Sequence, residues 1–328
     1  MRYITLLAAA ASAAAQNTIS TAFQLSEVGT WFENLAVRSD GFILATRMDA
    51  PEIWQIDPAT NTGEPLVTVP STLSTTGITE LTPDVFVFAV SNFSFVEPVG
   101  LTPGSLAVWK VDLNENEDGD AEPELVAEFP EAEFLNGMAT WDDKRVLVGD
   151  TMVNVVYLLD VETGEFEVAL DGPEVSGVNG IRVHEGDVYA VNTNDNLLYR
   201  IPVDDDARSA GEAEVVSEAL GLDDFDFGPD GAIYAANMSG NAVVKIQDGE
   251  VTTIAGGGDS REVLGPTSVR IGRGEGEGTI YVSTTGNGAF APPGTVGEPA
   301  GVMAIDISGG NGGRRDGRKG GSRCRPSR

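Results

Sequence analysis

Apolar and polar residues alternate in short runs along most of the chain, and clusters of Gly, Asp and Asn separate the runs. Alternation with a period of two, broken by turn residues, is typical of antiparallel β-hairpins. One layout recurs: a polar residue, a short alternating strand, a turn, and a strand of β-branched and aromatic residues. Six segments follow it, the second more faintly: ENLAVRSDGFILAT from Glu33, TGITELTPDVFVFAVSN from Thr76, NGMATWDDKRVLVGDT from Asn136, NGIRVHEGDVYAVNT from Asn179, DDFDFGPDGAIYAAN from Asp223 and PTSVRIGRGEGEGTIYVSTT from Pro266.

The spacing of these repeats indicates the fold. They begin 43, 60, 43, 44 and 43 residues apart, and the long interval holds an acidic insertion at residues 112–133. Four strands in a unit of this length are typical of propeller blades. A linear solenoid is the alternative, but it gives no reason for every unit to begin with a polar residue. We therefore predict an all-β fold, a six-bladed β-propeller of four-stranded antiparallel blades over residues 16–308, in which a strand near residues 19–28 completes the last blade.

The two ends of the chain differ in composition from the repeats. Residues 1–15 combine Arg2 with an apolar run and small residues, which predicts a cleaved secretory signal peptide rather than an alanine-rich first helix. Sequons at Asn92 and Asn237 are compatible with secretion and predict glycosylation. Residues 309–328 are rich in Gly and carry seven Lys or Arg against one Asp, which predicts a disordered basic tail. Since the only cysteine, Cys324, lies there, stability must come from packing.

The charge of the chain limits its partners. The formal net charge is −31. Nucleic acids and anionic membranes would be repelled, so neither is expected as a partner. After residues 1–15, no segment is long and apolar enough to form a membrane-spanning helix. We expect a secreted, soluble protein that is a monomer or a simple homo-oligomer.

The polar residues that begin the repeats are candidates for a central site, because the inner strands of propeller blades start beside the channel. Two carboxylates and two carboxamides among them supply oxygen ligands that suit Ca²⁺ or Mg²⁺. The single histidine, His184, excludes a multi-histidine zinc site. The alternative is that these side chains only satisfy backbone groups and water. The expected ring is Glu33, Thr76, Asn136, Asn179, Asp223 and Pro266.

The repeats resemble those of the SMP-30/gluconolactonase family, and especially its secreted fungal branch. The resemblance rests on Glu33 in WFENLAV, on Asn136 and Asn179 in Asn-Gly pairs, and on Asp223 in LDDFDFGPDG. It implies that Glu33, Asn136, Asn179 and Asp223 hold a divalent cation, and that Asp223 is the general base in members that hydrolyse lactones. Sugar lactonases of the family carry an Arg two residues before the first Asn, whereas this chain has Phe134.

Several other residues expected near the same mouth are also apolar, which favours a hydrophobic ligand. They are Trp31, Phe32, Met48, Phe93, Phe95, Met152 and Phe290. The single histidine and the position of the single cysteine in the tail exclude the usual serine and cysteine nucleophile arrangements.

The fungal branch includes hetero-Diels-Alderases, which join a tropolone or quinone-methide polyketide to a sesquiterpene such as humulene. Such a reaction requires an apolar cavity and a donor to the heterodiene carbonyl. Asn136 or Asn179 would donate, or the cation would act as Lewis acid, while Trp31, Phe95 and Phe134 bind the terpene. The resemblance and Phe134 thus favour a pericyclase of secondary metabolism with small apolar polyketide and terpene substrates. A metal-dependent lactonase and a non-enzymatic ligand-binding propeller are the alternatives.

Overall fold

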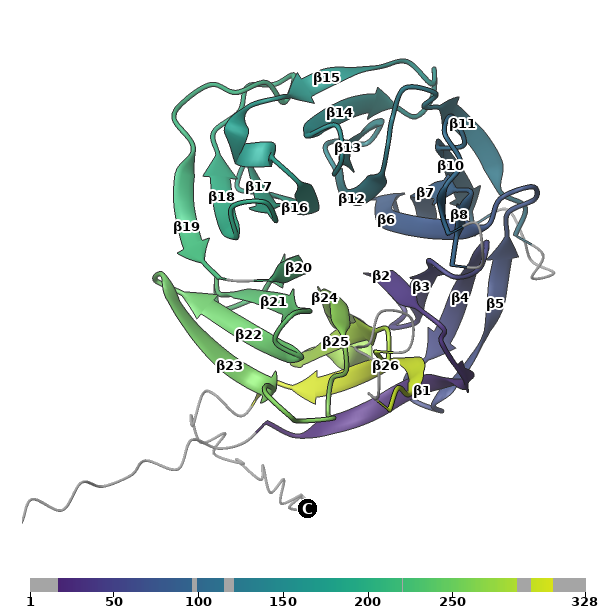
Figure 1. Ribbon diagram of the computed structural model, residues 1–328, viewed down its shortest axis with the longest axis vertical. Helices are drawn as coiled ribbons and strands as arrows, with labels where there is room; N and C mark the ends of the chain where they lie inside the picture. The colour runs from purple at the N-terminus through teal and green to yellow at the C-terminus, as the bar shows by residue number, and fades with distance from the viewer. Residues whose placement is uncertain (1–16, 96–98, 115–120, 220, 288–295, 309–328) are drawn as a thin grey trace, which may run out of the picture.

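The computed structural model describes residues 17–95, 99–114, 121–219, 221–287 and 296–308. They form six four-stranded antiparallel sheets arranged as blades around a central channel, which confirms the predicted propeller (Figure 1). The predicted signal peptide at residues 1–15 and the predicted tail at residues 309–328 lie outside the described residues. No helix in the described ranges is long and apolar enough to cross a membrane.

Each blade is described from its inner to its outer strand. Blade one has β2 (Phe32–Val37), β3 (Ile43–Arg47), β4 (Glu52–Asp57) and β5 (Thr62–Thr68). Blade two has β6 (Ser74–Thr82), β7 (Val85–Ser91), β10 (Ala107–Asp112) and β11 (Glu124–Glu128), with an inserted hairpin of β8 (Phe93–Ser94) and β9 (Gly100–Leu101). Blade three has β12 (Leu135–Thr140), β13 (Arg145–Asp150), β14 (Val155–Asp160) and β15 (Phe166–Leu170).

The remaining three blades follow the same order. Blade four has β16 (Val178–His184), β17 (Asp187–Asn192), β18 (Leu197–Ile201) and β19 (Glu214–Glu218). Blade five has β20 (Leu222–Phe227), β21 (Ile233–Asn237), β22 (Ala242–Gln247) and β23 (Glu250–Gly256). Blade six has β24 (Pro266–Ile271), β25 (Thr279–Thr284), β26 (Pro299–Asp306) and, as its outer strand, β1 (Ile19–Val28).

The ring closes as predicted, because the first strand of the chain completes the last blade. β1 pairs antiparallel with β26, with Ile19 opposite Ile305. Thr267 Oγ1 also donates to Phe32 O at 2.9 Å, which links blade six to blade one. The closure protects sheet edges and holds the inner strands in a fixed circle.

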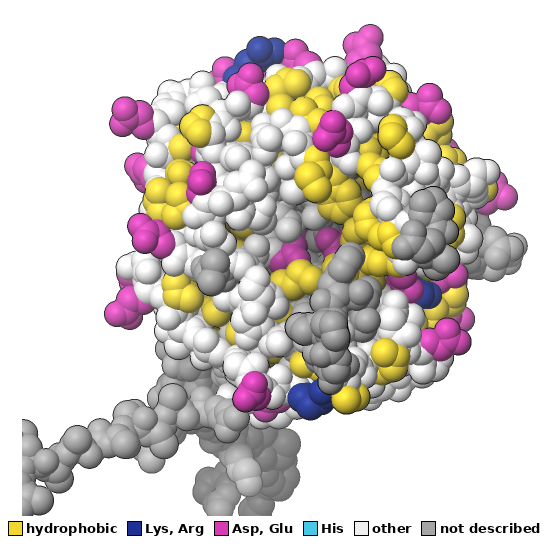
Figure 2. Space-filling view, viewed as in Figure 1, with side chains coloured by type: hydrophobic (Ala, Val, Ile, Leu, Met, Phe, Trp, Pro, Cys, Tyr) yellow, Lys and Arg dark blue, Asp and Glu magenta, His cyan; other side chains and the backbone are white. Residues whose placement is uncertain are grey.

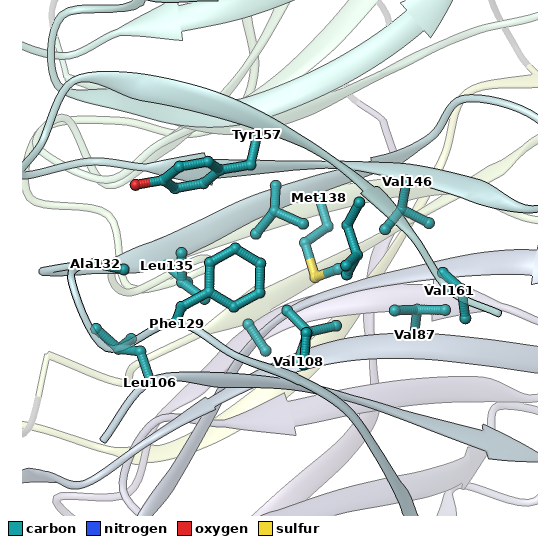
Figure 3. Packing of buried hydrophobic residues seen from close by; sticks show 14 residues of the cluster. Val87, Leu106, Val108, Phe129, Ala132, Leu135, Met138, Val146, Tyr157 and Val161 are labelled. Carbon is teal, nitrogen blue, oxygen red and sulfur yellow. The ribbon is translucent and has the colours of Figure 1, made fainter. Parts of the chain in front are cut away.

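The hydrophobic core lies between neighbouring blades. Between blades two and three, Val87 and Val108 face Leu135 and Met138, and Phe129 packs among them (Figure 3). Because both faces of a blade are covered, a middle strand can be apolar along most of its length, as in VFVFAVS of β7.

Asparagines in left-handed turns link successive blades at the end of the channel where the inner strands begin. In blades three to five, the turn between the second and third strands contains an Asn with positive φ. Its Oδ1 accepts from the amide of a glycine that precedes the next blade. The pairs are Asn154 with Gly177 at 2.6 Å, Asn196 with Gly221 at 3.3 Å and Asn241 with Gly265 at 2.9 Å.

Candidate functional site

The polar residues at the blade starts meet in a ring at one end of the channel. The inner strands lie side by side around it, and each shifts register against its neighbour at this point. A β-bulge of this kind re-aims side chains that a regular strand would direct into the sheet faces. The ring residues, one from each blade, are Glu33, Thr76, Asn136, Asn179, Asp223 and Thr267.

One predicted ring member is wrong. In blade six, Pro266 pairs with Thr284 on the second strand. In blade five, the equivalent pairing is made by the residue just before Asp223. Thr267 therefore occupies the ring position and Pro266 does not. The sixth repeat was aligned one residue too early, because the ring residue is the second residue of β24, as it is in β2, β12, β16 and β20.

Glycines next to the ring bring the inner strands close together. A Cβ atom on Gly77 would lie 1.9 Å from Asn136 O, and one on Gly137 would lie 1.9 Å from Asn179 O. No side chain fits at these distances. The Asn-Gly pairs therefore serve packing as well as chemistry, because glycine lets adjacent strands approach while the asparagine extends its amide into the ring.

A hydrogen-bond network joins the first and third blades. Trp31 Nε1 donates to Glu33 Oε2, and the Asn136 amide also donates to the Glu33 carboxyl. Asn34 Nδ2 in turn donates to Asn136 Oδ1 at 3.4 Å. All four side chains are buried. The sequence predicted Glu33 and Asn136 as partners in one site but did not predict the role of Trp31 and Asn34 in orienting them.

On the opposite side of the ring, the Asn179 amide donates to Asp223. This leaves Asn179 Oδ1 buried without a hydrogen-bond partner among the described residues. A buried unsatisfied acceptor is costly, so it calls for a donor or a cation that the described residues do not supply. Asn179 is thus the ring residue that points most directly to a ligand.

Burial and mutual repulsion disfavour charge on the ring carboxyls. Burial raises the pKa of Glu33 from 4.5 to about 7, the hydrogen bond from Trp31 opposes the rise, and the charge of Asp224 adds to it. The pKa of Asp223 is raised well above its usual range by burial and by the charges of Glu33 and Asp224. A carboxyl with a raised pKa in a buried site can hold a proton near neutral pH.

Asp224, next to Asp223, is anchored below the ring by two arginines. Its Oδ2 accepts from Arg182 Nη2 at 2.8 Å, Arg270 Nη1 at 2.9 Å and Ser268 Oγ at 3.1 Å. Burial nevertheless raises the pKa of Asp224, although the charge of Arg182 lowers it. The Asp224 carboxylate therefore points away from the ring side chains and belongs to a salt-bridge network below them.

The ring fits a hard cation by the chemistry of its donors. Glu33 and Asp223 offer carboxylate oxygens, and Asn179 offers the unpartnered amide oxygen. In the ranges that the structure describes, no cluster of three or more His, Cys, Asp and Glu side chains could hold a metal. A cation here would therefore depend on the carboxamides of Asn136 and Asn179, as oxygen-rich Ca²⁺ sites commonly do.

An aromatic wall stands beside the ring, formed by Trp31, Phe93, Phe95 and Phe134. The ring centroids of Trp31 and Phe95 are 5.6 Å apart and stacked, and those of Phe93 and Phe95 are 4.9 Å apart in a T-shaped contact. Phe93 also meets Phe134 at 6.4 Å. Apolar side chains gather on one side of the central hollow, and acidic side chains are visible at its floor (Figure 2).

The structure thus brings together the three predicted substrate-binding residues, Trp31, Phe95 and Phe134, and adds Phe93 as the contact between two of them. The other apolar residues expected at the mouth differ in exposure. Phe32 is fully buried in the core between blades and Met48 is buried, whereas Met152 is 62% exposed. Phe290 lies outside the described residues.

The two sequons have different surroundings. The Asn92 Oδ1 atom is buried without a partner among the described residues, next to the aromatic wall. Asn237 ends β21, and its Oδ1 accepts from Gly240 N at 2.8 Å. Glycosylation of either residue stays a prediction.

Fold and site define a six-bladed propeller with a buried ring of carboxyls and carboxamides below an apolar mouth. Comparison with known proteins agrees with this class. A Sarocladium schorii protein, provisionally named as a hetero-Diels-Alderase, is 27% identical over 307 residues, which cover 78% of this chain and 75% of the relative. A Phoma sp. protein with the same provisional name is 28% identical over 308 residues, covering 79% and 84%. No family model matches the chain.

Solved propellers share the fold at low identity. A luciferin-regenerating enzyme matches with a TM-score of 0.66 and 13% identity over 89% of this chain and 96% of its own. Regucalcin, a calcium-binding protein of Agrobacterium tumefaciens, matches at 0.61 and 15% over 86% and 91%. A provisionally named gluconolactonase matches at 0.60 and 14% over 90% and 93%. The predicted resemblance is confirmed: the chain has hetero-Diels-Alderase homologues, and its neighbours in fold are gluconolactonase- and regucalcin-like propellers.

Proposed function

We propose that this protein is a pericyclase of the hetero-Diels-Alderase type, which joins a tropolone or quinone-methide polyketide to a sesquiterpene such as humulene. The observation that carries the proposal is the aromatic wall directly beside the buried polar ring. An apolar alkene and a polar heterodiene need such adjoining surfaces. The provisional names of the two relatives support the same type of reaction.

The reaction itself needs no nucleophile. The alkene and the C=C–C=O unit of the heterodiene form one C–C and one C–O bond, and no atom, proton or electron leaves. The protein contributes by holding both partners in attack geometry, which can supply several kcal/mol, about 7 or more in favourable cases. A donor at the carbonyl oxygen accelerates bond formation further.

The ring limits which groups can donate to that carbonyl. Asn136 already gives a hydrogen bond to Glu33, and Asn179 gives one to Asp223. Each primary amide has two N–H donors, so a second remains for a substrate. The unpartnered Asn179 Oδ1 would accept from a hydroxyl group of the polyketide. Asn136 and Asn179 therefore form the polar half of the proposed site, and Trp31 with its aromatic neighbours forms the apolar half.

The test is adduct formation from humulene and a freshly generated tropolone quinone methide, followed by chiral chromatography. Enantioselective product above the uncatalysed background is expected. F134A should lower the catalysed rate about tenfold or more, because burial of one aromatic side chain is worth about 1.5–3 kcal/mol. F166A, at a partly exposed phenylalanine on the outer strand of blade three, is the matched control and should keep the rate. Unselective product, or equal loss in F134A and F166A, would overturn the proposal.

A metal-dependent lactonase is the second candidate, favoured by the oxygen donors of the ring. A cation bound by Glu33, Asn136, Asn179 and Asp223 would polarise a lactone carbonyl. Asp223 would then take the proton of the attacking water. The aromatic wall gives no partner for the hydroxyls of a sugar lactone. This candidate would be favoured if the protein hydrolyses a simple lactone, loses that activity with chelator and in D223N, and catalyses no cycloaddition. Saturable ligand binding without turnover would instead favour a non-enzymatic propeller.

A further inference from the structure

A second cavity lies at the opposite end of the channel, where the inner strands end. Its volume is about 270 Å³. All six blades contribute to it, so it is a feature of the closed ring and not of one loop. Residues that line it, one from each blade, are Val37, Glu80, Thr140, Arg182, Asp226 and Arg270.

Three arginines line the cavity of this strongly acidic protein, together with acidic partners. Arg182, Arg270 and Arg273 all line it. Arg182 and Arg270 share one buried carboxylate, that of Asp224, at 2.8 and 2.9 Å. Arg273 is paired with Glu80.

A further acid, Asp226, also faces the cavity, but its oxygens are engaged elsewhere. They accept from the amides of Phe227 and Ile271, each at 2.9 Å. The distance from Asp226 Oδ1 to Arg182 Nε is 4.0 Å, which is too long for a hydrogen bond. Among the described residues, Arg270 pairs only with the Asp224 carboxylate, which it shares with Arg182.

The hydrogen bonds of Arg270 use only one of its three nitrogens. Nη1 donates to Asp224, to Ser268 Oγ at 2.9 Å and to Val269 O at 2.7 Å. Nε and Nη2 have no hydrogen-bond partner among the described residues, and neither is a buried unsatisfied atom, so this edge of the guanidinium opens onto the cavity. The Nε–Nη2 edge is the one that pairs with both oxygens of a carboxylate.

We infer that this cavity binds a small carboxylate, whose two oxygens accept from Arg270 Nε and Nη2. The side chain is only 11% exposed, so the pair would form away from bulk water, where it is strongest. Ile78, Met138 and Ile271 provide apolar contacts for a short carbon chain. The volume is below the range of about 300–1,000 Å³ that is usual for drug-sized ligands, which limits the ligand to a few carbon atoms.

The site can be tested with acetate as the probe. Sodium acetate should raise the unfolding temperature saturably, and sodium chloride at equal ionic strength should not. R270K keeps the charge but loses the paired donors, and should weaken acetate binding about tenfold or more. R208Q removes an exposed arginine that is paired with Glu167 outside the cavity, and should leave the affinity within about threefold.

Equal effects of acetate and chloride, or unchanged affinity in R270K, would overturn the inference. If R270K does not fold, A139V provides a second test, because it narrows the cavity without touching an arginine and should also weaken binding. Cycloaddition is not part of either readout, so the site and the proposed function can fail separately.

Discussion

Replacement of Glu33 by Gln isolates the energetic cost of the buried ring carboxyl. Gln has almost the same shape, and its amide oxygen can still accept from Trp31 Nε1, so packing and the main hydrogen bond are kept. The ability to ionise is lost, and one of the two oxygens available to Trp31 and Asn136 becomes an amide nitrogen. Any difference in pH dependence between the two proteins therefore reports on Glu33 and on the carboxyl coupled to it, Asp223.

The sign of the effect follows from proton binding. Glu33 has a pKa of about 7 in the folded protein against 4.5 ordinarily, so the folded state binds the proton more tightly than the unfolded chain. Its contribution to stability is complete below pH 4.5 and is lost as the pH rises to about 7. At 1.36 kcal/mol for each pKa unit, the loss amounts to about 3 kcal/mol.

The assay is urea unfolding of both proteins in chelator between about pH 4 and 8, read as the free energy of unfolding. The wild-type value should fall relative to E33Q by about 3 kcal/mol across this interval. Excess Ca²⁺ or Mg²⁺ at the upper pH should stabilise the wild type more than E33Q, because E33Q keeps only one of the two ring carboxylates, that of Asp223. Parallel pH profiles would refute the assignment of a raised pKa to Glu33, and equal responses to the cation would refute its role as a ligand.

Three further outcomes are expected. G137A should destabilise the fold by about 2 kcal/mol or more, measured by urea unfolding, because its Cβ would lie 1.9 Å from Asn179 O. N241A should cost about 1–2 kcal/mol in the same assay, since it removes a bond to the next blade; a substitution that costs nothing would show that these asparagines do not hold the blades. Intact mass of protein secreted by a fungal host should show cleavage after about residue 15 and glycan on Asn92 or Asn237; an uncleaved, unmodified chain would contradict secretion.

Much of the fold could be predicted because a propeller repeats one local pattern. The period of about 43 residues, the alternation within each repeat and the polar first residue all reflect a blade that starts beside the channel. The ring residues Glu33, Asn136, Asn179 and Asp223 could be located for the same reason. The error at Pro266 arose because the sixth repeat was aligned one residue too early, and a register shift leaves no mark in the composition of a strand that would have corrected it.

The contacts that tune the site could not be predicted, because they join residues from different repeats. Arg182 and Arg270 lie 42 and 46 residues from Asp224, and nothing in the repeats that contain them marks them as its partners. The hydrogen bond from Trp31 to Glu33 is local, but Trp31 was predicted as an apolar surface for a ligand. An indole can do both, because its N–H lies in the ring plane while its faces remain available for stacking.

The two halves of the mouth have separate origins in the chain. The polar ring comes from the repeat, one residue from each blade, and is constrained by ring closure and by the glycines beside it. Half of the aromatic wall, Phe93 and Phe95, comes from the segment inserted between β7 and β10. At the equivalent place, blades three to five have only short turns, at residues 151–154, 193–196 and 238–241. Changes in this insertion can alter the apolar surface while the inner strands stay in place. The insertion in blade two, more than the ring, is therefore expected to determine which apolar substrate this propeller accepts.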